Sequence, residues 1–257
     1  MAKWTTFPHA GDYEFDAASL KKSWARLHQG DCEPFPKDAA VLQAWVFFHN
    51  GEFQKAAEAG IKAGGAGLVA ANKATSIYAN YLEAKEKTKL ELFMEVAERA
   101  EAQQADDPKN ANAYYWQAYA LGRYGQGISV AKALAQGLGT KVKNALEQAI
   151  RLQPKHADAH IALAAFHAEV IDKVGSLIGG MTYGAKKDVG LNLFKEALTL
   201  NPGSAIAMIE YANGMVMLEG DKKMKDATKL YEQAATSKPL DATERLDVEM
   251  AKAELED

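Results

Sequence analysis

Three histidines between residues 156 and 167 are of a type and spacing that could do chemistry. His156 and His160 lie four residues apart, which can place two imidazoles on one face of a helix, and His167 follows seven residues later. No Cys, Asp or Glu completes an obvious ligand set, and apolar residues such as Leu163 and Phe166 stand between His160 and His167. The pattern therefore predicts buried, neutral histidines bonded to backbone groups. It predicts no metal and no cofactor.

Patterns of known catalytic sites do not occur in the sequence. The G-x-S-x-G elbow of serine hydrolases is absent. The run GRYGQG has no strand before it, and its glycine spacing fits neither phosphate-binding motif. The single cysteine, Cys32, cannot form an internal disulfide. We therefore predict that the protein is not an enzyme.

Two glycine-rich segments are basic and contain no acidic residue. Residues 122–143 include Arg123 and Lys141, and residues 173–187 include Lys186 and Lys187. Exposed backbone N–H groups and cationic side chains can together bind an anion, so these four residues are candidates for an anionic ligand or an acidic partner. The alternative is structural: the glycines let inserted loops fold back on the helices, and the lysines keep them soluble.

The elements that must position these residues are helices separated by prolines. Pro108, Pro154, Pro202 and Pro239 each follow one apolar, alanine-bearing stretch and precede another, at intervals of 46, 48 and 37 residues. Strand signals are nearly absent. The aligned stretches have a shared pattern of large and small residues, which predicts stacked helical hairpins with the prolines in the turns between them.

This pattern resembles the tetratricopeptide repeat, a 34-residue helical hairpin. The residues that match it best precede and follow Pro202: His160, Leu163, Ala164, His167, Gly190, Phe194, Ala197, Met208, Tyr211, Ala212, Ala227, Tyr231 and Ala234. The resemblance implies an all-α, right-handed α-solenoid. Because the intervals exceed 34 residues, we expect two long insertions inside hairpins, at residues 122–143 and 173–187, which meet on one edge of the solenoid.

The repeats predict one helical-repeat domain over residues 1–257. An N-terminal helix and loop occupy residues 1–38, degenerate hairpins follow at 39–108, and the best-matching units span 109–239. Residues 240–257 form a charged amphipathic helix, which we interpret as a solvated end cap, with Asp241 or Thr243 as its N-cap.

In tetratricopeptide arrays the first helices of the hairpins line a concave groove, so the resemblance places the partner-binding surface there. The residues at these positions are Asn112, Tyr115, Tyr119, Ile161, Ile209 and Asn213. The family's carboxylate clamp needs cations where Ile161 and Ile209 stand. An extended or helical segment with apolar anchors suits this groove better.

Composition and resemblance leave two functions open. Hydrophobic residues make up 48% of the chain and its net charge is −4, which is typical of globular proteins and does not favour nucleic-acid binding. No apolar stretch near the N-terminus has the length found in a signal peptide, and no segment has the ~18 apolar residues of a membrane-spanning helix, so we expect a cytoplasmic protein.

The first function is a non-enzymatic adaptor or scaffold that binds a protein or peptide and is compatible with a homo-oligomer. The second is a small-molecule or hydrophobic-ligand binding protein, because residues 145–235 also resemble the T component of tripartite transporters and the helical-repeat regulators of microtubule dynamics. An adaptor requires an open, wet groove. A ligand binder requires inserts that close over an apolar pocket.

Overall fold

The computed structural model describes residues 3–256, and the regular structure in this range is helical without any strand. The helices are α1 (Ala17–Leu27), α2 (Ala39–His49), α3 (Phe53–Ala63), α4 (Gly67–Tyr81), α5 (Glu86–Asp106), α6 (Ala111–Ile128), α7 (Val130–Ala135), α8 (Leu138–Leu152), α9 (Ala157–Tyr183), α10 (Lys187–Leu200), α11 (Ala205–Glu219), α12 (Met224–Ala235) and α13 (Ala242–Glu256), with a short 3-10 helix, η1 (Asp221–Lys223), before α12. None of these helices is both long and apolar enough to cross a lipid bilayer.

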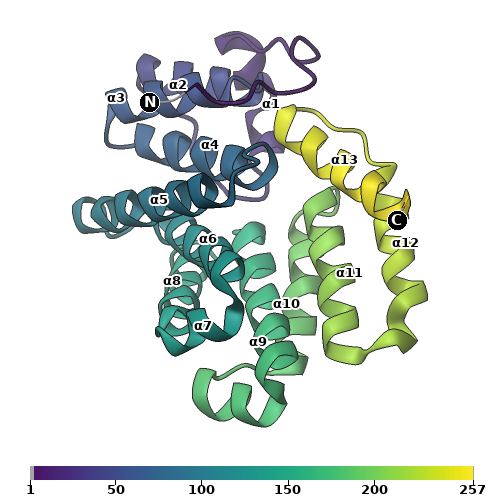
Figure 1. Ribbon diagram of the computed structural model, residues 1–257. Helices are drawn as coiled ribbons and strands as arrows, with labels where there is room; N and C mark the ends of the chain where they lie inside the picture. The colour runs from purple at the N-terminus through teal and green to yellow at the C-terminus, as the bar shows by residue number, and fades with distance from the viewer. Residues whose placement is uncertain (1–2, 257) are drawn as a thin grey trace.

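Successive helices pair into hairpins, which confirms the predicted α-solenoid. The pairs in contact are α2 with α3, α4 with α5, α6 with α8, α9 with α10, and α11 with α12. Figure 1 shows these hairpins following a curved path, so that α13 at the C-terminal end returns to the N-terminal helices α1 and α2. The hairpins therefore surround a central space, which the first helices of the pairs face.

The four prolines lie in the turns between hairpins, as predicted, and each turn ends in the same way. The residue two positions after each proline caps the next helix: its side chain accepts a hydrogen bond from the backbone N–H three residues further on. The capping residues are Asn110, His156, Ser204 and Asp241. Proline stops one helix, and the cap satisfies an N–H group that the next helix leaves unpaired.

Both insertions are present inside hairpins, but they are mostly helical rather than glycine-rich loops. The first extends α6 to Ile128 and adds the short helix α7 before α8. The second extends α9 to Tyr183 across a kink at Gly175, where φ is +79°. The two inserts touch, because a Cβ placed on Gly184 would lie 3.5 Å from Cε of Lys143.

The last helix differs from the solvated end cap expected from the sequence. α13 buries Leu246, Asp247 and Val248 and packs against α2, α11 and α12. Its N-cap is Asp241, which accepts from the N–H of Glu244 at 2.8 Å. A terminal helix in a curved solenoid can meet the opposite end of the chain, and contacts of that range leave no local signal in the sequence.

Candidate functional site

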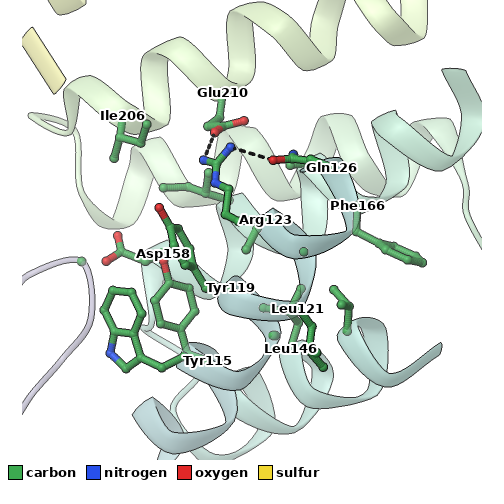
Figure 2. A pocket seen from close by; sticks show the side chains of 18 of the residues that line it. Tyr115, Tyr119, Leu121, Arg123, Gln126, Leu146, Asp158, Phe166, Ile206 and Glu210 are labelled. Atoms are coloured by element: carbon green, nitrogen blue, oxygen red, sulfur yellow. Dashed lines mark hydrogen bonds and ion pairs between the residues drawn. The ribbon is translucent and has the colours of Figure 1, made fainter. Parts of the chain in front are cut away.

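The central space contains a cavity of about 210 Å³ between α4, α6, α9, α11 and α13. Figure 2 shows Arg123 in its middle, with Tyr115, Tyr119 and Asp158 on one side and Leu121, Leu146 and Phe166 on the other. The cavity therefore has two parts of different chemistry, one polar and one apolar, which meet at Arg123.

The apolar part, which we call the apolar arm, runs between α6, α7, α8 and α9. It is lined by small and aliphatic residues and one aromatic ring: Gly125, Val130, Ala133, Leu134, Leu138, Gly139, Val142, Leu146, Phe166 and Val170. Most of them belong to the first insert or lie directly beside it. The insert thus folds into walls for the cavity and adds apolar surface that a 34-residue hairpin would lack.

Arg123 projects from α6 across the cavity to α11. One guanidinium nitrogen is 2.9 Å from Oε1 of Glu210, another donates to Gln126 at 3.1 Å, and the guanidinium carbon lies 5.3 Å from the centre of the Tyr119 ring. Gln126 in turn donates to Glu169. Burial, and then the neighbouring charge of Glu210, raises the pKa of Glu169. The Arg123–Glu210 ion pair, which Tyr119 and Gln126 also contact, therefore marks the boundary of the apolar arm.

Two other carboxyl groups in the cavity wall, Asp158 and Asp247, have pKa values raised to near neutrality. Burial, followed by the nearby charge of Asp31, raises the pKa of Asp158 to about 7. Burial is also the main cause that raises the pKa of Asp247 to about 7, although Tyr81 donates a hydrogen bond to it. These groups have little positive charge to balance them, and their proton content therefore changes around neutral pH.

Two buried oxygen atoms that line the cavity have no hydrogen-bond partner within residues 3–256. They are Oδ1 of Asn201, at the turn before α11, and Oγ1 of Thr243, in the first turn of α13. Unpaired buried acceptors cost free energy, so such atoms usually have a partner. Asn201 and Thr243 are therefore two cavity-wall residues that each carry an unsatisfied oxygen atom.

Residues 28–33 enter the central space from the N-terminal side and form a buried polar network. Asp31 is 2.6 Å from Nζ of Lys73 and 2.8 Å from Nδ1 of His28. Asn112 donates to the backbone oxygen of Asp31 at 3.1 Å and to Glu33 at 2.6 Å. The chain itself therefore occupies part of the inner surface that the repeat pattern assigned to a partner.

The same region ties the two ends of the solenoid together. His49 bonds to Asp241 at 2.7 Å, and Arg26 bonds to Glu244 at 2.9 Å. The Nε2 atoms of His28 and His49 lie 3.2 Å apart. Because His28 also bonds to Asp31, the His49–Asp241 contact is linked to the polar network of residues 28–33. The cavity is therefore closed on one side by helices that are distant in the sequence.

The predicted groove residues divide into three groups. Tyr115, Tyr119 and Ile161 line the central cavity. Ile209 and Asn213 line a second cavity, of about 320 Å³, which shares Arg123, Glu169 and Glu210 with the first. Asn112 lies under residues 31–33, as described above.

The predicted basic residues do not all lie on one surface. Arg123 points inward and pairs with Glu210, because α6 continues as a regular helix at this position and directs the side chain to the centre. Lys141 and Lys186 are exposed on the two inserts. Lys187 lies 3.4 Å from Glu219. Three lysines thus remain on the outer surface of the inserts and one arginine is internal.

The histidines are buried and bonded to backbone groups, as the repeat register predicts. His160 contacts the backbone oxygen of His156 at 2.9 Å, and Nδ1 of His167 accepts from the N–H of Lys186 at 3.2 Å. Burial lowers the pKa of both His156 and His167 to about 4, so both are neutral at pH 7. Nδ1 of His156 accepts in its cap, and its Nε2 therefore donates to Asn112.

Sequence reasoning missed the buried network and most of the cavity wall. Lys73 gave one usable signal, because a single lysine stands inside the otherwise uncharged helix GLVAANKATSIYANY. A lone charge in such a helix is typical of a buried ion pair. Its partner, Asp31, is 42 residues away, and the spacing gives no indication of it.

These features define a tetratricopeptide-like helical-repeat protein with an internal cavity. Its fold is similar to the crystal structure of a thermophilic TPR protein of Thermus thermophilus, with a TM-score of 0.57 and 17% sequence identity, over 83% of this chain and 97% of that one. The model of the family described as regulator of microtubule dynamics protein 1-3 matches residues 68–256. The chain belongs to this family. A comparison with curated proteins finds no match.

Proposed function

We propose that this protein binds an amphipathic small molecule in its central cavity, with an aliphatic chain in the apolar arm and an anionic head at Arg123. The observation that carries the proposal is the junction of the two parts: an arm with apolar walls opens onto a half-buried guanidinium. This is the arrangement expected of the second function that the sequence left open. A ligand pocket is typically apolar, with a few polar groups that fix orientation.

The apolar arm favours an aliphatic chain for an energetic reason. Unfilled apolar space inside a protein costs stability, because the atoms around it lose packing contacts. Moving an aliphatic chain from water into the arm gains about 25 cal/mol for each Å² of apolar surface buried. Water gains little there, since the walls of the arm offer it few hydrogen bonds.

Arg123 favours an anionic head. A guanidinium presents a planar fork of donors that matches a carboxylate or a phosphate, and Glu210 now occupies part of that fork. An incoming anion would compete with Glu210 for these donors. Burial and the charge of Glu210 raise the pKa of Glu169, so this neighbour is protonated more easily than an ordinary glutamate, which would lessen repulsion between the head and the cavity wall.

Binding of dodecanoate, measured by calorimetry, tests the proposal. Ala133→Phe fills the arm, and we expect the affinity to fall at least tenfold. Ala131→Phe is the matched control, because Ala131 lies on the same short helix and is exposed. The double variant Arg123→Gln with Glu210→Gln removes both charges together; it should weaken dodecanoate binding and leave binding of the uncharged 1-dodecanol unchanged. Equal affinities of the wild type and Ala133→Phe for dodecanoate, or no binding by either, would refute the proposal.

The adaptor function remains the second candidate, since the second cavity offers it a surface. Ile209 and Asn213 line this cavity together with Asn80 and Tyr231, and such amide and phenol groups can bond to the backbone of an extended peptide. The filled-arm variant separates the two functions. An adaptor would keep its affinity for a partner when the arm is filled, and a ligand binder would lose its ligand. The cytoplasmic location, the absence of catalysis and the single-domain organisation remain predictions.

A further inference from the structure

The tip of α9, which we define as residues 176–183, presents large apolar side chains to solvent. Leu177 is 73% exposed, Ile178 55% and Met181 82%. Positions 177, 178 and 181 lie on one side of a helix. Figure 1 shows this part of α9 beyond the kink, at the side of the molecule away from α1 and α2.

The tip is oriented opposite to an ordinary surface helix. Its small residue faces the body of the protein: Gly179 is buried, and a Cβ placed there would lie 3.3 Å from Cγ1 of Val170. Its long apolar residues face outward. A surface helix usually buries its apolar face against the core. This helix instead buries glycine and exposes leucine, isoleucine and methionine, so its apolar face is available to contact something other than water.

Lysines flank the tip in the sequence and also lie on the neighbouring first insert. Lys173 precedes the kink, Lys186 and Lys187 follow the tip, and the adjacent first insert contributes Lys132, Lys141 and Lys143. Neither insert contains a carboxylate within residues 122–143 or 173–187. The carboxylates near the inserts include Glu169, Asp188 and three that pair with lysines: Glu147 with Lys143, Asp172 with Lys173, and Glu219 of α11 with Lys187. Lys132, Lys141 and Lys186 form no ion pair within the described chain.

We infer that the tip of α9 docks on an anionic lipid surface, with Leu177, Ile178 and Met181 inserted among the lipid chains. The shape supports a lipid surface over a peptide, because a convex tip can enter a soft phase, whereas a peptide needs a groove to lie in. The charge also fits: a lysine near an anionic bilayer contributes about 1 kcal/mol to binding. Long lysine side chains reach the head groups while apolar neighbours insert.

Docking would also place the apolar arm near the lipid, since Val170 contacts the tip and lines the arm. This consequence rests on the proposed function, but the docking itself does not. The tip can bind a membrane whether or not the cavity takes a ligand.

Flotation of the full chain with vesicles tests the inference. We expect binding to vesicles of phosphatidylcholine and phosphatidylserine in a 7:3 ratio, and at least fivefold less binding to phosphatidylcholine alone. The triple variant Leu177→Ser, Ile178→Ser, Met181→Ser should lose at least fivefold in binding to the anionic vesicles. Met217→Ser with Met224→Ser is the matched control, because these methionines are 40% and 50% exposed at the α11–α12 turn. This control should bind like the wild type.

Charge and insertion give two further readouts. Lys141→Glu with Lys186→Glu should reduce vesicle binding at 50 mM salt much more than at 500 mM salt, because salt screens exposed charges. In the variant Met181→Trp, brominated phosphatidylcholine in the anionic vesicles should quench the fluorescence of the introduced tryptophan. In the variant Met217→Trp it should not.

Three results would overturn the inference: no binding to anionic vesicles, equal binding of the triple variant, or a concentration-dependent dimer that the triple variant loses. The last would assign the tip to a second copy of the chain. Calorimetry with dodecanoate keeps the two proposals separate, since the triple variant should bind dodecanoate like the wild type.

Discussion

At the scale of single residues, the central space is organised by buried charges that satisfy one another. Lys73 bonds to Asp31 and lies 5.3 Å from the centre of the Phe48 ring. Despite burial, which acts in the opposite direction, the charges of His28 and Lys73 hold the pKa of Asp31 well below its ordinary value. Such a network fixes where residues 28–33 lie, since each buried charge is costly without its partner.

The charge of Asp158 is poorly compensated, because burial and the nearby charge of Asp31 both act against its ionised form, and this gives a pH-dependent prediction. Its pKa is about 7 in the folded protein, above the ordinary 3.8. The folded state therefore prefers the protonated form: the cost of ionisation is absent below about pH 4, grows as the pH rises, and is complete above pH 7. Asp158→Asn should melt close to the wild type at pH 4 and about 3 °C or more above it at pH 8.

A matched control for this measurement is Asp188→Asn. Asp188 occupies the second position of α10, as Asp158 does in α9, but it is exposed. For Asp188→Asn, the difference in melting temperature from the wild type should not increase with pH. If Asp158→Asn melted with the wild type at both pH values, the carboxylate would not be destabilising in the fold.

At the scale of helices, close packing depends on small residues at particular crossings. A Cβ placed on Gly60 of α3 would lie 2.5 Å from the backbone oxygen of Gly67 in α4. No side chain fits at that distance, so the glycines set how closely α3 and α4 approach. Further along the solenoid, Ala164 of α9 and Ala212 of α11 are small residues that are fully buried.

Gly60→Ala should therefore destabilise the protein by about 1–3 kcal/mol in urea unfolding, because the added methyl group meets backbone that cannot move away easily. Gly122→Ala is the comparison, since Gly122 lies inside α6 with nothing within 4 Å of an added Cβ. Alanine favours a helix over glycine by roughly 0.5–1 kcal/mol, so this variant should be as stable as the wild type or more so. Equal changes in stability for Gly60→Ala and Gly122→Ala would contradict the conclusion that Gly60 sets the distance between α3 and α4.

At the scale of the whole molecule, α13 closes the solenoid onto its own N-terminal part. Leu246 is buried in the same apolar core as Trp24 and Trp45, and Val248 packs with Ile209 of α11. Together with the His49–Asp241 and Arg26–Glu244 contacts, these residues join positions about 200 residues apart in the sequence. The cavity therefore depends on α13 as much as on the repeats.

Leu246→Ala should cost about 2–5 kcal/mol of stability, as is typical of a leucine truncated in a core. Because α13 holds the closure, hydrogen exchange should increase more in residues 28–33 than in α5. Leu255→Ala on the same helix is the control; Leu255 is 41% exposed, and its removal should change neither quantity. Faster exchange spread evenly over all helices would show that α13 is not specifically coupled to residues 28–33.

The sequence by itself determined the helices, the turns and the repeat. These depend on residues close together in the chain: a proline, a capping residue two positions later, and apolar residues at the spacing of a helix face. The same register correctly placed His160 and His167 inside. It also placed Tyr115, Tyr119 and Ile161 on the inner surface, where they line the cavity, but tertiary structure decided the rest of the site. Arg123 pairs with Glu210 across 87 positions, and Asn112 meets Glu33 across 79. Such contacts arise from the curvature of the stack, which adds small rotations over all hairpins and which no local pattern encodes.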